Sequence, residues 1–236
     1  IRDLELSLPQ IWGRKIVSVF FGGGTPSLFS AKSIDTLLTA ARTLLPLEHF
    51  AEITLEANPG TFEAQKFADF RAAGINRLSV GIQSFNAQHL KALGRIHDDG
   101  EAYRAIEIAL KNFDNVNLDL MYALPDQMLE EAQQDITAAL AYGVPHISAY
   151  HLTLEPNTLF HRNPPPLPDD DSAAAMQEMI EQTLAGSGYQ HYETSAFARP
   201  GKESRHNLNY WSFGDYLGIG AGAHSKLSFA DRIVRQ

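Results

Sequence analysis

Three polar side chains with ligand-binding chemistry occupy matching positions near the ends of three apolar segments of this sequence. They are Glu56 in segment 51–58, Gln83 in segment 75–84 and Asp119 in segment 115–121. Two carboxyl groups and one amide gathered in one place can hold a polar ligand through charge and hydrogen bonds. The plainer alternative is that all three are hydrogen-bonded polar residues of an ordinary core.

A glycine-rich loop follows the apolar stretch Lys15–Phe21 and reads Gly22-Gly23-Gly24-Thr25-Pro26-Ser27. The pattern predicts a strand, a loop and then a helix that begins near Ser30. Consecutive glycines allow positive φ and bring bare N–H groups close to a ligand, which suits a carboxylate or a phosphate. Taken alone, the loop also fits an ordinary turn between strand and helix, because it matches neither the Walker motif nor G-x-G-x-x-G.

The elements that must position these residues alternate between strand and helix five times. This alternation predicts an α/β fold with parallel strands, either a doubly wound sheet or a barrel. A doubly wound sheet is apolar on both faces, whereas a barrel collects polar site residues on its inner face. The polar face that carries Glu56, Gln83 and Asp119 therefore favours the barrel. The predicted strands are 15–21, 51–58, 75–84, 115–121 and 146–154.

Composition narrows the function classes. The 236 residues include 19 basic and 28 acidic ones, for a formal net charge of −9. This balance argues against a sequence-independent nucleic-acid surface and against strong attachment to anionic lipid. No apolar run is long enough to span a bilayer and no signal peptide is visible, so we expect a cytoplasmic protein.

Cysteine is absent from the sequence, so these residues can form neither a disulfide nor a thiolate metal site. The sequence begins at Ile1 within a helical pattern and ends at Gln236 without a stop signal. We therefore expect it to be a piece of a longer chain.

The pattern changes after Glu155, and we predict one unit over residues 1–155 and a second, α+β segment over 156–236. A proline-rich linker at 163–168 is followed by the acidic run 169–171, which suits the first turn of a helix. The remaining segment contains His206-Asn207-Leu208-Asn209-Tyr210-Trp211 and the glycine-rich turn Gly218–His224. We interpret His224 as structural.

Several motifs in fixed order resemble the radical S-adenosylmethionine (SAM) enzymes of the oxygen-independent coproporphyrinogen III oxidase group. They are the glycine loop, Glu56-Ala57-Asn58-Pro59, Gly81–Phe85, Leu93–His97 and Asn117–Met121. Three later motifs narrow the resemblance to the HemW-type haem chaperones: Tyr192–Ser195, His206–Trp211 and Gly218–His224. The resemblance runs from about Lys15 to the end of the sequence.

The resemblance implies a partial (β/α)6 barrel that holds SAM at the carboxyl ends of its strands. It places the methionine end of SAM at Gly23, Gly24 and Thr25. It assigns further contacts to Glu56, Gln83, Arg95, Asp119 and the backbone of Ala149. Backbone amides and arginine suit the SAM carboxylate, while the acidic residues suit its ammonium or its ribose diol. Arg95 and His97 also fit a solvated loop.

One feature departs from the family. Radical SAM enzymes hold a [4Fe–4S] cluster on three cysteines of a CxxxCxxC loop after the first strand. That strand and loop would lie upstream of Ile1, so we expect a cluster only in a full-length protein. The sequence as it stands cannot ligate the cluster, and the missing strand leaves Lys15–Phe21 at a sheet edge.

The resemblance implies a haem-binding protein that delivers haem to haem-dependent client proteins, with a homodimer as one arrangement. His206 suits an axial ligand, while Tyr210 and Trp211 suit the wall beside a porphyrin. Because these residues follow the proline-rich linker, we expect them to act independently of the SAM residues. The alternative is a coproporphyrinogen III oxidase, and a third interpretation is a metal-free barrel enzyme such as an aldolase or an isomerase. The cavity of such an enzyme would be expected to carry a lysine or an acid/base pair.

Overall fold

The computed structural model describes residues 1–61, 63–95 and 99–236. The strands are β1 (Ile16–Phe21), β2 (Leu47–Ala57), β3 (Arg77–Gln83), β4 (Val116–Tyr122), β5 (His146–His151), β6 (Gln190–Glu193), β7 (Ala196–Ala198), β8 (Lys226–Ser228) and β9 (Ile233–Arg235). The helices are α1 (Arg2–Ile11), α2 (Ala31–Leu44), α3 (Ala64–Ala73), α4 (Ala87–Ala92), α5 (Asp99–Asn112), α6 (Leu129–Ala141), α7 (Leu159–Arg162), α8 (Asp170–Gly186) and α9 (Arg205–Trp211).

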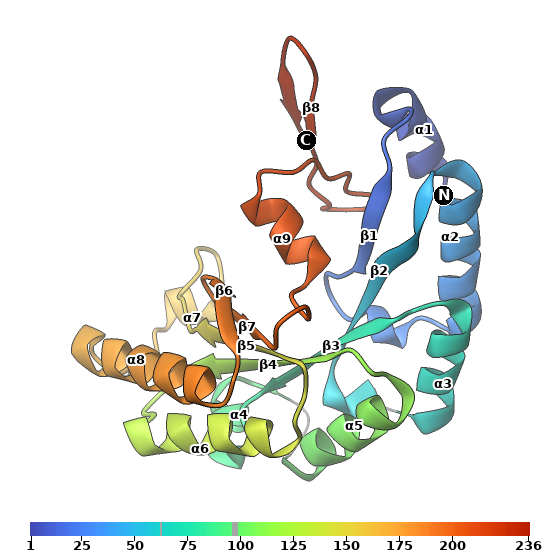
Figure 1. The fold of residues 1–236 in the computed structure, drawn as a ribbon. Coiled ribbons are helices and arrows are strands. Elements are labelled where there is room, and N and C mark those ends of the chain that lie inside the picture. Colours follow the sequence, from blue (N-terminus) through green and yellow to red (C-terminus); the bar gives the residue numbers. More distant parts are fainter. Residues whose placement is uncertain (62, 96–98) are drawn as a thin grey trace.

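One sheet of seven strands organises the molecule, in the order β1-β2-β3-β4-β5-β7-β6. Strands β1 to β5 pair in parallel, β7 pairs antiparallel to β5, and β6 pairs antiparallel to β7. The sheet curls into a half-barrel, as Figure 1 shows. The predicted partial barrel is therefore confirmed, and β1 lies at one edge of the sheet as expected.

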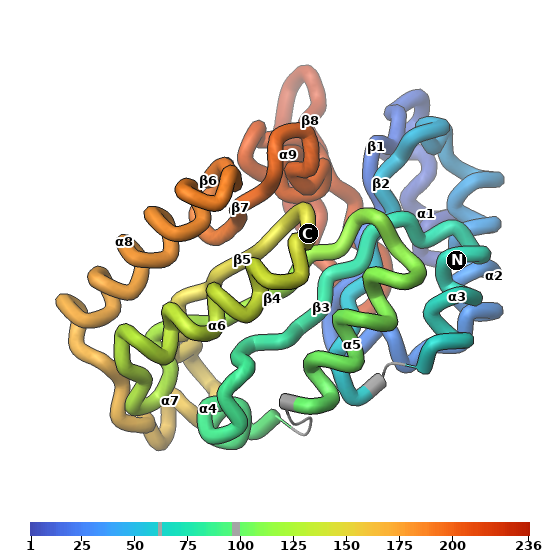
Figure 2. Tube along the Cα trace, turned by 60° about the horizontal axis from the view of Figure 1, so that its bottom comes forward, coloured from blue at the N-terminus to red at the C-terminus, as the bar shows by residue number. Residues whose placement is uncertain are grey.

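Helices cover the outer side of this half-barrel. Figures 1 and 2 show α2, α3, α5, α6 and α8 in succession along the convex side of the strands, while α9 lies within the arc. Helix α9 contacts β1 and β6, which lie at the two ends of the strand order. The strands thus form the wall of the half-barrel, and α9 lies inside the arc, opposite their inner face.

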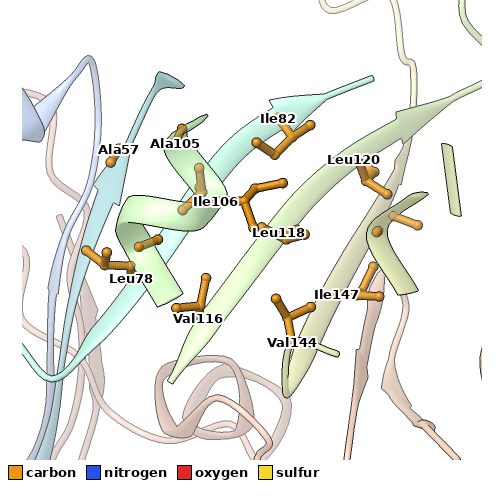
Figure 3. Packing of buried hydrophobic residues seen from close by; sticks show 14 of the residues in the cluster. Ala57, Leu78, Ile82, Ala105, Ile106, Val116, Leu118, Leu120, Val144 and Ile147 are labelled. Carbon is orange, nitrogen blue, oxygen red and sulfur yellow. The ribbon is translucent and has the colours of Figure 1, made fainter. Parts of the chain in front are cut away.

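The core lies between the sheet and its outer helices. Aliphatic side chains alternate along each strand and point outward, among them Leu78 and Ile82 of β3 and Leu118 of β4 (Figure 3). They pack against helix residues such as Phe70 and Ile106, which are fully buried. Because side chains alternate across a strand, this outward apolar set leaves the intervening polar residues on the inner face. The predicted two-faced pattern of the strands is confirmed.

Local signals fixed several helix starts. Ser30 caps α2 by accepting a hydrogen bond from the Ser33 N–H at 3.1 Å, as predicted. Asp169 caps α8 in the same way, with the Ser172 N–H at 2.8 Å. The first turn of α8 therefore carries acidic side chains where the helix dipole favours them.

Two sets of short elements were not among those predicted from the sequence. The stretch before Gly94 contains the short helix α4, which Asn86 caps by accepting from the Gln88 N–H at 2.9 Å. The stretch Tyr189–Phe197 forms two short strands, β6 and β7, and these extend the main sheet. Neither element is long enough to show a periodic apolar pattern.

A second, smaller cluster joins the two ends of the chain. Leu4 and Ile11 of α1 pack with Leu227 of β8. Asp215 binds both Arg14 and Lys226, the latter at 3.1 Å, and these ion pairs hold the β8–β9 hairpin near β1. Over the ranges that the structure describes, no helix combines the length and apolar character that a membrane span needs.

Candidate functional site

A cavity of about 360 Å³ opens on the inner face of the half-barrel. Strands β1 to β5 supply most of its wall, and α9 supplies Asn207. Three of the sequence-predicted residues, Glu56, Gln83 and Asp119, meet here, because the carboxyl ends of parallel strands lie at the same edge of a sheet. Arg95 and Gly24 line the same cavity.

Backbone geometry sets the position of Gln83. This last residue of β3 has φ of 69°, a left-handed conformation that is uncommon for a residue other than glycine. The next two residues are held by Asp135 of α6, which accepts from the Ser84 hydroxyl and from the Phe85 N–H, each at 2.7 Å. A buried carboxylate on an outer helix therefore fixes the turn that aims Gln83 into the cavity.

The glycine loop is tied to the same polar residues. The Gly23 N–H donates to Glu56 Oε2 at 3.1 Å, and the Asn58 side-chain amide donates to Thr25 Oγ1 at 3.2 Å. Gly23 and Gly24 have φ of 80° and 63°, so both need the conformational freedom of glycine. The loop thus lies against Glu56, with Gly24 on the cavity wall.

Burial raises the pKa values of the two carboxyl groups in the cavity. Loss of solvent raises the pKa of Asp119, against the opposing effect of hydrogen bonds from Ser79 and Asn117. Burial also raises the pKa of Glu56, and the charge of Asp119 adds to that rise while the Gly23 N–H opposes it. A cationic group bound between these carboxyl groups would lower both pKa values and stabilise both charges. The site is therefore suited to an ammonium group.

Three predicted residues do not contribute a side chain to the cavity. The Ala149 side chain points outward into the core, and its N–H donates to the Ser195 carbonyl at 2.8 Å. Gly23 and Thr25 lie in the loop beside Gly24, where they bind Glu56 and Asn58. The candidate His97 lies outside the residues that the structure describes.

The predicted haem segment forms α9 and packs against β1. The His206 ring stacks on Phe20 with centroids 4.3 Å apart and meets Tyr210 edge-on at 4.9 Å. The Trp211 indole N–H donates to Glu193 Oε2 at 3.0 Å. Phe20 and Asn207 both line the cavity that holds Glu56 and Asp119. The predicted haem residues His206, Tyr210 and Trp211 are not part of this cavity wall, but their helix reaches it through Asn207, and Phe20, on which His206 stacks, lines it. That the two predicted sets act independently stays a prediction.

Sequence reasoning missed a buried hydrogen-bond chain that connects the cavity to α9. Asn117 of β4 donates to Asp119 Oδ1 at 2.8 Å and to Ser79 Oγ at 2.7 Å. Its oxygen pairs with His146 Nδ1 at 2.6 Å, and His146 Nε2 pairs with the Tyr192 hydroxyl at 2.7 Å. The same hydroxyl accepts from the N–H of Ser204, the residue that caps α9, at 3.2 Å. The period-2 pattern placed Ser79 and Asn117 on the polar face, but it carries no information about the distant Tyr192.

The hydrogen-bond partners of His146 determine which of its ring nitrogens carries the proton. Asn117 uses its amide nitrogen for Ser79 and Asp119, so its oxygen accepts and His146 Nδ1 must donate. His146 Nε2 then accepts from the Tyr192 hydroxyl. Burial lowers the pKa of His146 well below its usual value, with Arg77 adding to the effect, which agrees with a neutral ring.

His206 makes folding stability depend on pH. Burial, with a contribution from Arg77, lowers its pKa to about 4. Between an ordinary histidine pKa of about 6.5 and this value, the unfolded chain binds a proton that the folded chain does not. The contribution of His206 to stability therefore falls as pH falls through that window. The limit is about 1.4 kcal/mol per pH unit for one proton, reduced here because the ring is partly exposed.

We expect the variant His206→Phe, which keeps an aromatic ring against Phe20, to lose less stability than the wild type between pH 7 and pH 5. Urea unfolding at both pH values measures this difference, with the exposed His161→Phe as the matched control. An equal loss in His206→Phe and in the wild type would assign the pH dependence to other groups.

The comparisons with known proteins agree with this geometry. A family model described as the radical SAM superfamily matches residues 5–139. The chain is 53% identical over 240 residues to "Heme chaperone HemW" of Escherichia coli (strain K12), covering 100% of this chain and 63% of that protein. It is 54% identical over 231 residues to "Heme chaperone HemW" of Haemophilus influenzae, covering 96% of this chain and 60% of that protein. The chain thus spans about three fifths of the length of these curated relatives.

Solved structures show the same fold. The structure titled as coproporphyrinogen III oxidase (HemN) from Escherichia coli, a radical SAM enzyme, superposes with a TM-score of 0.80 at 24% identity. The match covers 95% of this chain and 55% of that one. The archaeal Elp3 from Methanocaldococcus infernus superposes with a TM-score of 0.60 at 14% identity, over 75% of this chain and 47% of that one. At these identities the likeness concerns the fold alone.

Proposed function

Since this chain belongs to the radical SAM superfamily, we propose that its half-barrel binds S-adenosylmethionine and that the protein is a haem chaperone. In this proposal it holds haem and passes it to haem-dependent client proteins. The observation that carries the chaperone proposal is the 53% identity, over the whole of this chain, to a protein named as a haem chaperone. A cytoplasmic location and a homodimer belong to the same proposal.

The cavity fits SAM in volume and in chemistry. Its volume of about 360 Å³ is in the range of small-molecule sites, and its wall combines two carboxyl groups with an amide and a glycine loop. Glu56 and Asp119 are the proposed partners of the SAM ammonium and ribose diol, with Gln83 beside them. Gly23, Gly24, Thr25 and Arg95 would hold the carboxylate, and Ala149 would contribute through its backbone carbonyl.

The residues present do not fit an iron–sulfur cluster. A [4Fe–4S] centre needs thiolate ligands, and the sequence contains no cysteine. We propose that any cluster of the whole protein is held by residues outside this sequence.

The surroundings of His206 suit a haem ligand. Among the described residues, neither ring nitrogen of His206 has a hydrogen-bond partner, and its lowered pKa keeps the ring neutral, the form that binds iron. Tyr210, Trp211 and Phe213 are exposed beside it, and aromatic side chains pack well against a porphyrin. The cavity is too small for a whole porphyrin together with SAM, so haem would lie over α9 rather than inside the half-barrel.

A coproporphyrinogen III oxidase is the second candidate function. It is supported by the motifs that resemble the coproporphyrinogen III oxidase group, whereas the TM-score of 0.80 to HemN, at 24% identity, concerns the fold alone. A metal-free aldolase or isomerase is the third interpretation. The described cavity wall includes no lysine, but it does include the carboxyl groups of Glu56 and Asp119, so the family membership and not the wall makes this interpretation the weakest.

Haem titration tests the proposal. We expect the wild type to bind haem with a shifted Soret band, and His206→Ala to alter that spectrum and weaken binding about tenfold or more, about 1.4 kcal/mol. His161→Ala, at an exposed histidine, is the matched control. Haem bound identically by wild type and His206→Ala would remove His206 as the ligand, and no haem binding by either would end the chaperone proposal.

Two parallel measurements complete the test. Turnover of coproporphyrinogen III by a cluster-containing, full-length protein would favour the oxidase. A SAM titration of His206→Ala shows how far α9 influences the cavity, because Phe20 and Asn207 line it. We expect a small change in SAM affinity, below that of the cavity carboxyl variants.

A further inference from the structure

Arg77 is a buried cation that lines the cavity. It is the first residue of β3, is 2% exposed, and forms part of the cavity wall. Within the described ranges its Nε has no hydrogen-bond partner, and the carboxylate oxygen with which it is paired, Glu52 Oε2 of β2, is 3.9 Å away. A guanidinium has five N–H donors arranged to bind a carboxylate through two parallel bonds, and the contact with Glu52 does not use this capacity.

The Glu52 carboxylate accepts hydrogen bonds from the start of α9. Its Oε1 accepts from the Ser204 hydroxyl at 3.2 Å and from the His206 N–H at 3.3 Å, which attaches β2 to the start of α9. Glu52 therefore lies beside Arg77 as a counter-charge and serves α9 as a hydrogen-bond acceptor. Leaving buried charged donors without hydrogen bonds is unfavourable, so a ligand that supplies oxygen atoms would be stabilised at Arg77.

Asn207 presents a second donor at the same cavity. Its Oδ1 accepts from the Ser204 hydroxyl at 3.3 Å, while its side-chain nitrogen has no partner in the part of the chain that the structure describes. Two neighbouring hydroxyl groups on the wall are already paired: Ser79 donates to Asp119 and Ser148 donates to Asn117. Arg77 and Asn207 thus remain as unused donors.

The two ends of the cavity carry side chains of opposite charge. Glu56 and Asp119 give the carboxyl ends of the strands an acidic character. Near the start of β3, burial lowers the pKa of His146 and of His206, and the positive charge of Arg77 adds to both shifts. Arg77 and Gln83 mark the two ends of β3, whose seven residues span roughly 20 Å at the rise of a strand. One end therefore suits a cation and the other suits an anion.

We propose that Arg77 and Asn207 form a carboxylate-binding site for an organic ligand other than SAM. This ligand would occupy the end of the cavity where the strands begin, while SAM occupies the end where they finish. The inference rests on the proposed SAM function. It adds a second ligand class, a small organic molecule that presents a carboxylate group.

Propionate is the probe, and propionamide is its uncharged control. We expect propionate to shift the Arg77 Nε–H and Asn207 side-chain NH₂ resonances with a saturable, millimolar affinity, also when SAM is present at saturation. Propionamide should leave both resonances in place. Arg77→Met should weaken propionate binding at least tenfold, whereas Arg104→Met, at an exposed arginine of α5, should bind as the wild type does.

A second variant guards against loss of folding. Glu52→Gln combined with Arg77→Met removes both charges and keeps an oxygen for Ser204 and His206, and it should also fail to bind propionate. Absence of a saturable shift, equal shifts by propionamide, or displacement of propionate by SAM would each overturn the inference. A SAM titration of the same wild-type sample separates the outcomes: SAM binding without propionate binding leaves the proposed function standing, whereas failure of SAM to bind removes its basis.

Discussion

Replacing Asp119 with alanine is expected to weaken SAM binding by about 1–3 kcal/mol, or roughly 5- to 150-fold in affinity. Asp119 lies on the inner face of β4, where burial raises its pKa and Ser79 and Asn117 hold both of its oxygens. A bound ammonium would stabilise the ionised form, so removal of the carboxyl group costs a charge-assisted contact. Glu56→Ala should act in the same direction.

Calorimetric titration with SAM measures this effect. Asp119→Asn keeps the shape and some hydrogen bonds but removes the charge, so it separates attraction to the ammonium from simple packing. The exposed Asp114→Ala, close to the start of β4, is the matched control. Unchanged affinity in both Asp119→Ala and Glu56→Ala would exclude these carboxyl groups from the SAM site.

The strand-end residues of the site were predictable because their signal is local. Alternation within β2, β3 and β4 placed Glu56 and Asp119 on the face opposite the buried aliphatic residues, and the structure has them there. Gln83 follows the same rule despite its positive φ. Since parallel strands end at one edge, the pattern of each strand alone was enough to bring these side chains together.

The placement of α9 was not predictable from such patterns. Its position depends on contacts between residues far apart in the sequence: Ser204 binds Glu52 across 152 positions, and Arg205 donates to the Phe50 carbonyl across 155. No periodicity links these residues. The expectation that His206 acts apart from the SAM residues followed from their separation in sequence, and it stays a prediction; what the sequence pattern did not indicate is that the fold brings Asn207 of α9 to the same cavity.

For the same reason, the buried series of hydrogen bonds from Asn117 to Tyr192 could not be predicted from the sequence. Asn117 and His146 belong to neighbouring strands whose register, Asn117 beside His146, is set only by folding. Tyr192 comes from β6, which reaches this place because β7 pairs antiparallel to β5. This series of hydrogen bonds determines which groups donate and which accept on the inner face, and it connects the cavity to the residue that caps α9.

Asn117 is the centre of this chain, and Asn117→Leu is expected to lower the free energy of unfolding by roughly 2–6 kcal/mol. The estimate follows because His146 Nδ1 and the Ser148 hydroxyl each lose their acceptor in a buried site, at about 1–3 kcal/mol each. Leucine is close to asparagine in size, so a cavity contributes little. The effect therefore measures the hydrogen bonds.

Urea unfolding measures the loss, and Asn112→Leu is the matched control. Asn112 is partly buried at the end of α5, and among the described residues its side chain bonds only to the Ile108 carbonyl, at 2.8 Å. The same substitution there should cost far less, because no buried group except that carbonyl loses a partner. A loss for Asn117→Leu no larger than for Asn112→Leu would mean that the chain of hydrogen bonds adds little to stability. A larger loss for Asn117→Leu would instead show that Asn117 couples the carboxyl groups of the cavity to Tyr192 and the start of α9. In that case we also expect Asn117→Leu to bind SAM more weakly than the wild type.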